Sequence, residues 1–367
     1  MGNLNFSGFY ADNKLFMGMC FWLHRGGMAA LLISVFLVFL PVKLGAEVMS
    51  LVSPESKENY EIAPKNRGGY FPGIYFTEAI NTAWKTEDSS PYWVRTQAEQ
   101  ETLNRMVTDY SSLLLNNDIL AFYGHPRSQQ MGILGRYSIE ELDKRLTALA
   151  GEYEAESGGR KVIKAFYIIY GTVWPEGEIG IIGDETLTRY IDYALHNDIL
   201  VFIDHQIGRY DPVNSLKRML PWLKYPNVHL ALDPEWRTTK PMKEIGFVTA
   251  NEINRAQQVM EEYIIANDIP GERFLVVHQF NWRMIQNREK VDSGFRRVRL
   301  VHCADGFGSP HLKRASYAFN AEVTNIPIKA FKLFYNFNIP GAGYDHPLLT
   351  PKEVYALRPR PYIIMYQ

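Results

Sequence analysis

The chain has 367 residues, of which 46% are hydrophobic and 22% are charged, and its formal net charge at pH 7 is −1. This length suffices for one large domain or two small ones, with a sizeable core in either arrangement. A charge so close to zero gives no general attraction to nucleic acid or to an anionic membrane surface, so we expect neither as a partner.

Residues 1–46 have the pattern of a secretory signal peptide. The basic stretch HRGG (24–27) precedes the apolar run MAALLISVFLVFL (28–40), and small residues follow. The apolar run is shorter than the roughly 20 residues that span a bilayer. Because Leu44 fits a cleavage site after Ala46 poorly, an uncleaved membrane anchor is the alternative. We therefore expect an exported protein that is periplasmic, on the cell surface or secreted, with any membrane contact made through this segment.

Residues 47–117 are expected to form an N-terminal extension of the folded domain. Residues 48–75 are rich in proline, glycine and charge, which is typical of a tether, and residues 95–117 have a helical pattern. Cys20 lies upstream of the apolar run and would leave with the signal. Cys303 would then have no partner for an internal disulfide, and we interpret it as a small core residue.

Residues 118–367 alternate between expected strands and expected helices, which predicts parallel β/α units. Eight strands over about 250 residues is the usual size of a (β/α)8 TIM barrel, and this is the α/β fold that we predict. The expected strands are 119–124, 161–171, 199–206, 228–235, 274–281, 298–305, 328–336 and 361–367, and the expected helices are 138–156, 184–197, 212–223, 249–267 and 310–322. An open doubly wound sheet is the alternative, but residues 124–135 lack the glycine-rich phosphate turn that it needs.

Polar side chains gather where the predicted strands end. Functional residues of TIM barrels lie at the carboxyl ends of the strands, and the strand interiors here are mostly apolar. His278 and Gln279 cannot both face the barrel axis, because side chains alternate along a strand. Lys332 lies in an aromatic-rich strand and must reach a carboxylate or the cleft. The candidate substrate-binding residues are Tyr123, His125, Gln206, Trp236, His278, Gln279, Asn281, Asp305, Lys332 and Tyr335.

The stretch HLALDPEW (229–236) places two carboxylates at the end of the fourth predicted strand. Alternation along the strand puts Asp233 and Glu235 on the barrel-axis face with Ala231, and the neighbouring leucines on the helix face. Repulsion and partial burial would raise the pKa of one acid, which is how a site keeps a protonated carboxyl near neutral pH. Asp204, at the end of the neighbouring strand, would bring a third carboxylate.

A protonated acid beside a carboxylate is the arrangement that cleaves glycosidic bonds. Glu235 is therefore the predicted acid, Asp233 its orienting or charge-stabilising partner, and Asp204 or Asp305 the second carboxylate. We predict a hydrolase that acts on a polysaccharide or cell-envelope glycan and uses no metal or other cofactor. Rings that could stack on sugars follow three of the strands, at Trp174, Trp236 and Trp282.

The D-x-E ending of this strand resembles that of the chitinase-like and lysozyme-like (β/α)8 glycosidases. The resemblance implies that Glu235 is the proton donor and Asp233 its partner. The longer D-x-x-D-x-D-x-E signature of the chitinases is absent, because Ala231 stands two residues before Asp233. A broader resemblance is to a group of uncharacterised exported bacterial barrel proteins. It rests on HLALDPEW, VVHQF (276–280), DGFGSP (305–310), KLFY (332–335) and TPKEVYAL with the closing YQ, and implies the barrel fold and export.

Several simpler interpretations stay open at this stage. Asp233 and Pro234 could only begin a turn, since Asp-Pro favours turn initiation. His125 could be a turn histidine, and His205 should pack against the helices. A metal-dependent hydrolase, either an amidohydrolase-like or a phosphodiesterase-like barrel, is the second functional class, with His125, His278, His302 and Asp305 as ligands. Amidohydrolase-like barrels, however, open with H-x-H on the first strand, where this chain has a single histidine. The third class is a barrel that binds a glycan without cleaving it.

Overall fold

The computed structural model describes residues 113–367. The predicted signal or anchor and the extension up to residue 112 lie outside the described residues. Residues 113–116 form a turn and a bend, and the first strand begins at Asn117, so the expected helix over 95–117 does not reach its predicted end. Within residues 113–367, no helix is both long and apolar enough to cross a bilayer.

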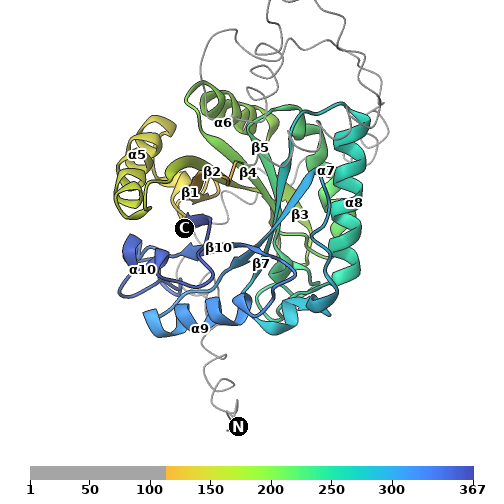
Figure 1. The fold of residues 1–367 in the computed structure, drawn as a ribbon. Coiled ribbons are helices and arrows are strands. Elements are labelled where there is room, and N and C mark those ends of the chain that lie inside the picture. The colour runs from red at the N-terminus through yellow and green to blue at the C-terminus, as the bar shows by residue number, and fades with distance from the viewer. Residues whose placement is uncertain (1–112) are drawn as a thin grey trace, which may run out of the picture. The chain divides into compact units, whose positions relative to one another are not determined.

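Eight parallel strands form a closed barrel, which confirms the predicted (β/α)8 fold (Figure 1). Strand β1 pairs with β11 on one side and with β2 on the other, so the open-sheet alternative is wrong. Around the barrel, the strands follow the order β1, β11, β10, β9, β7, β5, β4 and β2. Their bounds are Asn117–Gly124 (β1), Lys161–Val173 (β2), Leu200–His205 (β4), Val228–Leu232 (β5), Arg273–Gln279 (β7), Val298–Ala304 (β9), Ile328–Leu333 (β10) and Ile363–Tyr366 (β11).

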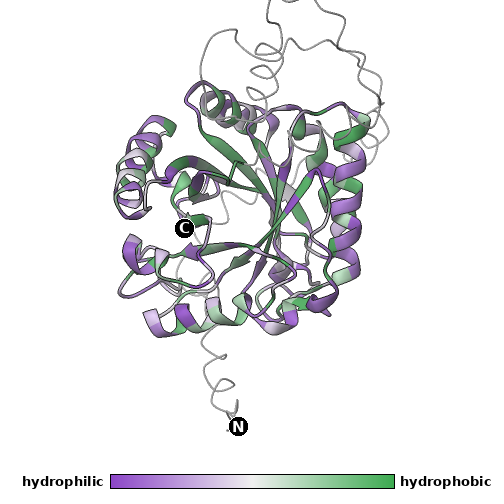
Figure 2. Ribbon diagram, viewed as in Figure 1, coloured by the Kyte–Doolittle hydropathy of each residue, from purple (hydrophilic) through white to green (hydrophobic). Residues whose placement is uncertain are grey.

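Helices cover the outside of the barrel, with polar residues along their length, whereas the strands are mostly apolar (Figure 2). The predicted start at Ser138 is confirmed, because its side chain accepts from the backbone N–H of Glu141. Thr249 and Glu252 form a full capping box. The helices are Ile139–Glu156 (α5), Asp184–His196 (α6), Pro212–Met219 (α7), Ala250–Ala266 (α8), Pro310–Ala321 (α9) and Pro351–Tyr355 (α10).

Short elements that the sequence pattern did not predict lie in the loops of the barrel. Strand β3 (Ile179–Ile181) pairs antiparallel with the end of β2, and β6 (Val248–Thr249) pairs with β8 (Ile285–Gln286). Short 3-10 helices follow two strand ends directly, at Pro234–Trp236 (η6) after β5 and at Trp282–Met284 (η7) after β7. The others are η4 (Leu134–Arg136), η5 (Leu220–Lys224) and η8 (Arg288–Lys290).

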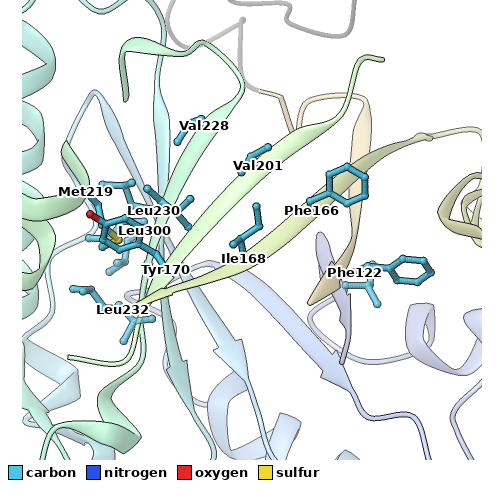
Figure 3. Close-up of a cluster of buried hydrophobic side chains, with 14 of the residues drawn as sticks. Phe122, Phe166, Ile168, Tyr170, Val201, Met219, Val228, Leu230, Leu232 and Leu300 are labelled. Carbon is cyan, nitrogen blue, oxygen red and sulfur yellow. The ribbon is translucent and has the colours of Figure 1, made fainter. Parts of the chain in front are cut away.

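The core has two layers, one inside the barrel and one between the strands and the helices. Ala231 belongs to the inner cluster, whereas Leu230 and Leu232 belong to the outer one, as the alternation predicted. Figure 3 shows these two leucines near Met219 of α7 in the outer layer. The inner cluster also contains Cys303, which is free and buried as expected. The inner layer fills the barrel, so polar groups in it must pair with one another.

Candidate functional site

The two carboxylates of HLALDPEW lie on either side of a tight turn and not on one straight strand. Strand β5 ends at Leu232, and Asp233 then caps the 3-10 helix η6, which contains Glu235. One oxygen of Asp233, Oδ1, accepts from the backbone N–H of Glu235 at 3.3 Å. Asp233 is 2% exposed, whereas Glu235 is partly exposed. The strand predicted over 228–235 is therefore too long at its end, and the Asp-Pro turn coexists with an inward-facing acid.

The turn that carries Glu235 is fixed by contacts to the following loop. The backbone N–H of Gly246 donates to the carbonyl of Glu235 at 2.6 Å. Arg237 forms an ion pair of 2.7 Å with Glu252 and donates to the carbonyl of Phe247 at 3.0 Å. These contacts join the Glu235 turn to the start of α8, so the acid is held by rigid structure and not by a free loop.

Asp204, at the end of β4, is fully buried inside the barrel. Its Oδ2 accepts a 2.9 Å hydrogen bond from the hydroxyl of Tyr123 in β1 and lies 3.6 Å from Nε2 of His278. Its other oxygen, Oδ1, has no hydrogen-bond partner within residues 113–367. A buried carboxyl oxygen without a donor is costly when charged, which favours the protonated form.

Asp305 lies at the centre of the cluster and pairs with two cationic groups. His278 Nδ1 lies 3.0 Å and Lys332 Nζ 3.1 Å from the same oxygen, Oδ2 of Asp305. The other oxygen accepts from the N–H of Gly306 at 2.8 Å. Lys332 Nζ also lies 3.8 Å from the ring centroid of Tyr123. Lys332 therefore pairs with a carboxylate inside the barrel, that of Asp305, as the sequence predicted.

The four acids of the cluster fall into two groups according to whether their pKa is raised or lowered. These acids are Asp204, Asp233, Glu235 and Asp305. Burial raises the pKa of Asp233 to about 7; the positive charge of His278 opposes this shift, and Asp204 adds to it. Burial also raises the pKa of Glu235 well above its ordinary value, and repulsion from Asp233 adds to the effect. Burial raises the pKa of Asp204 against the attraction of His278 and Lys332. Three carboxyls therefore hold protons more tightly than they would in water.

Asp305 behaves in the opposite way. Burial alone would raise its pKa, but Lys332, His278 and the N–H of Gly306 lower it below the ordinary range. Burial would likewise lower the pKa of Lys332, but Asp305 and Asp233 hold it above its usual value. Burial also opposes a charge on His278, yet Cys303, Asp204 and Asp305 raise its pKa well above the usual value. Asp305 is thus the charged acid of the group.

A second buried ion pair positions the strand ends that carry Asp305 and Lys332. Lys313 of α9 is 2% exposed, and its Nζ donates to the carbonyl oxygens of Gly306 and Lys332. Asp345 lies 3.5 Å from this ammonium group and accepts from the N–H of Phe334 at 3.0 Å. The ion pair of Lys313 and Asp345 therefore holds the loop after β9 and the end of β10 together.

Four of the candidate substrate-binding residues belong to the buried cluster. Tyr123, His278, Asp305 and Lys332 are each at most 5% exposed, so they lie beneath the barrel mouth and not on its surface. Glu235 is the partly exposed acid above them. The sequence left open which of His278 and Gln279 faces the axis, and the structure assigns this position to His278.

Gln279 and Tyr335 lie away from the cluster, which corrects their expected position. Gln279 Oε1 lies 2.8 Å from Nε2 of His302, on the helix side of the strands. The ring of Tyr335 lies 5.1 Å from that of Tyr366 and packs against the outer layer. His302 is therefore also on the outer side, so the four metal ligands considered above do not converge. Residues 113–367 contain no group of three or more His, Cys, Asp or Glu side chains that could hold a metal ion.

The remaining candidates have local roles or stay at the surface. Gln206 Oε1 accepts from the N–H of Val173 at 2.8 Å and so joins the ends of β4 and β2. Asn281 caps η7 by accepting from the N–H of Arg283 at 3.0 Å. His125 Nδ1 accepts from the N–H of Arg127 at 3.1 Å, as a turn histidine would. Trp236 is partly exposed at the end of η6.

Tyr167 is the site residue that the sequence did not indicate. It lies within β2, and its hydroxyl is 2.8 Å from Nε2 of His278. Its ring stacks on that of Phe202 at a centroid distance of 5.1 Å. In the sequence it is one aromatic residue among several in an apolar strand. Tyr170, at the end of the same strand, belongs to the outer layer.

Comparisons with known proteins give no family assignment. No protein-family model and no curated protein matches the chain. Among solved structures, it is similar to the GH18 chitinase ChiB of Flavobacterium johnsoniae, at 11% identity and a TM-score of 0.37, over 68% of this chain and 87% of that one. It is also similar to a family 18 chitinase from Crocus vernus, at 9% identity and a TM-score of 0.37, over 68% and 92%. A beta-glucosidase from Thermotoga maritima matches at 9% identity and a TM-score of 0.29, over 68% and 87%.

Proposed function

We propose that the chain is a glycoside hydrolase-like enzyme in which Glu235 donates the proton to the departing glycosidic oxygen. One observation carries this proposal: Glu235 is a partly exposed acid whose pKa is raised, and it lies close enough to the buried Asp233 and Asp305 for their charges to act on it. A general acid must be protonated at the working pH and must also reach the substrate. Of the four acids in the cluster, Asp204, Asp233 and Asp305 are each at most 5% exposed and do not meet the second requirement.

The reaction would use the cluster in a simple way. The proton of Glu235 moves to the leaving oxygen as the bond between this oxygen and the anomeric carbon breaks. Positive charge then develops on the sugar, and the carboxyl group of Asp233, two residues before Glu235, would stabilise it in its ionised form. Water adds to the anomeric carbon and returns a proton to the Glu235 carboxylate, which restores the acid. Asp305 takes no direct part, because Lys332 and His278 neutralise it.

A glycan is the substrate class that the surrounding side chains favour. Trp174 and Trp282 are 55% and 61% exposed, and each lies just after the carboxyl end of a barrel strand, β2 and β7 respectively. Flat aromatic rings at these places suit the apolar faces of sugar rings, whose hydroxyl groups stay solvated. Together with the signal-like N-terminal pattern, this favours a polysaccharide or envelope glycan outside the cytoplasm.

The test is turnover by the full-length protein on a panel of chromogenic glycosides and purified envelope glycans. Glu235→Gln should lower turnover by about 10²–10⁴-fold while leaving the thermal midpoint nearly unchanged. Glu244→Gln is the matched control, because Glu244 follows in the same loop but its carboxylate bonds only Lys240 and the Thr238 hydroxyl within residues 113–367, away from the buried acids. Full activity of Glu235→Gln would refute the assignment of the acid. Glycan binding without any turnover would favour the non-catalytic barrel.

A further inference from the structure

His278 has a role other than the substrate contact that its position at a strand end suggested. It is 0% exposed, so no ligand at the barrel mouth touches it. Its ring nitrogens instead face two different acids: Nδ1 lies 3.0 Å from Asp305 Oδ2, and Nε2 lies 3.6 Å from Asp204 Oδ2. The Tyr167 hydroxyl lies 2.8 Å from Nε2, and the thiol of Cys303 is a further close neighbour of the ring.

We propose that His278 is a positioning residue: a permanently protonated imidazolium that, with Lys332, pairs with Asp305, the charged acid of the cluster, and so leaves the site's mobile proton on Asp233 and Glu235. The catalytic part of this inference rests on the proposed function. The charge state of His278 does not, and it can be measured in a protein without known activity.

The geometry supports a doubly protonated ring. A neutral imidazole has a single N–H, whereas the charged form donates from both nitrogens. The Tyr167 hydroxyl at Nε2 can accept from a charged ring or donate to a neutral one, so the charged form is favoured by the two flanking acids, Asp305 at 3.0 Å from Nδ1 and Asp204 at 3.6 Å from Nε2. Asp305 Oδ2 also accepts from Lys332, so it offers negative charge to two donors at once. A neutral ring would leave Asp204 without a cationic neighbour among the described ion pairs.

The distribution of cations explains which acids keep their protons. Lys332 and His278 are the cations of the cluster, and both pair with Asp305. The ion pairs of residues 113–367 join no cation to Asp233 or Glu235. Both cations therefore pair with Asp305, and neither Asp233 nor Glu235 has a direct counter-ion among these ion pairs. The other titratable groups that face His278 are Tyr123 of β1, Tyr167 of β2 and Cys303 of β9.

The first measurement is nitrogen NMR of the full-length wild-type protein with ¹⁵N-labelled histidine. The chain contains nine histidines, and a pH of about 8.5, roughly two units above the usual pKa of imidazole, is chosen so that only a strongly stabilised imidazolium stays charged. Burial lowers the pKa of His125, His205, His229 and His302, so these rings are neutral. We expect one ring that still has both nitrogens protonated. A spectrum with only neutral rings would overturn the inference, and no variant has to fold for this result.

The second measurement uses His278→Gln with His302→Gln as its control. His302 is 1% exposed and lies on the outer side of β9, so the two variants replace equally buried rings. His278→Gln should remove the protonated ring from the NMR spectrum, whereas His302→Gln should remove a neutral one. Loss of a neutral ring in His278→Gln would contradict the assignment.

If the protein cleaves glycosides, the same variants test the catalytic consequence. His278 lowers the pKa of both Asp233 and Glu235 by its charge, so its removal should move the pH–activity profile about one unit towards alkaline pH. His302→Gln should leave the profile in place. An unmoved profile in His278→Gln would overturn the positioning role. Absence of wild-type turnover would count against the proposed function alone, because the NMR result stands without activity.

Discussion

The hydroxyl of Tyr123 donates to Oδ2 of Asp204 at 2.9 Å, and this bond joins β1 to β4 past the intervening strand β2. The contact of Tyr167 in β2 with His278 in β7 likewise links strands that are not neighbours. Because the other oxygen of Asp204 has no donor within residues 113–367, the state of this acid depends on Tyr123 and His278.

Tyr123→Phe should therefore lower both the stability of the protein and its turnover. A buried carboxyl that loses its donor costs about 1–3 kcal/mol, measured as the free energy of unfolding in urea. The pKa of Asp204 should rise further, since the tyrosine hydrogen bond lowers it, and turnover should fall by about tenfold. Tyr153→Phe is the control, because its hydroxyl bonds Tyr366 in the outer layer at 2.8 Å. It should affect stability but not turnover. Unchanged turnover in Tyr123→Phe would exclude a part for this bond in the site.

Asp233→Asn should stabilise the protein at alkaline pH. The folded-state pKa of Asp233, about 7, lies above the unfolded value, so its contribution to stability is present below about pH 4. That contribution is lost as the pH rises through 7. The variant has no carboxyl group to ionise at this position, so its stability does not fall in this way. Its Asn side chain can still accept from the N–H of Glu235. Relative to the wild type, its free energy of unfolding should therefore gain on the order of 2 kcal/mol between pH 5 and pH 8.

Urea unfolding at the two pH values measures this gain. Asp211→Asn is the matched control, because Asp211 also caps a helix through backbone N–H groups but is exposed. Its effect should be the same at both pH values. If Asp233→Asn also gave equal effects at pH 5 and pH 8, Asp233 would not be the acid that burial keeps protonated.

Gly246→Ala should displace the turn that carries Glu235. A Cβ atom at Gly246 would lie 2.4 Å from the backbone nitrogen of Arg237 and 2.5 Å from the carbonyl oxygen of Pro234, and backbone cannot yield as a side chain does. We expect a loss of about 1–3 kcal/mol in stability. We also expect a loss of turnover larger than the fraction of unfolded protein explains.

Gly151→Ala provides the control for the same change of residue. Gly151 lies in α5, and a Cβ atom there would meet nothing within 4 Å. Alanine should stabilise this helix by roughly 0.5–1 kcal/mol and leave turnover unchanged. Normal turnover in Gly246→Ala would mean that the position of the Glu235 turn does not limit the reaction.

The barrel could be predicted because its signal is local and repeated. Apolar runs such as those of β4 and β9 alternate with capped amphipathic helices, and each unit favours the same fold independently. The positions of Ala231 and Leu230 followed from alternation alone, because the small residue and the large one face different layers. The turn at Pro234 shortened the expected strand, since η6 is too brief to leave a periodic pattern.

The composition of the site could be predicted only in part. Asp204, Asp233 and Lys332 are polar residues within apolar surroundings, and burial forces such residues to find each other. Tyr167 and Tyr335 look alike in the sequence, but only the closed barrel decides that one faces the axis and the other the helices. Lys313 is hidden for a different reason: on an amphipathic helix, a lysine is normally solvated.

The ring of strands is completed by the pairing of Ile119 in β1 with Ile363 in β11. Before β11 is synthesised, both β1 and β10 present an unpaired edge, and open edges invite association with other chains. Joining segments so distant along the chain also makes closure slow. A nascent polypeptide would therefore keep an open barrel until almost all of it has been translated, which leaves time for chaperones to bind the unpaired strand edges.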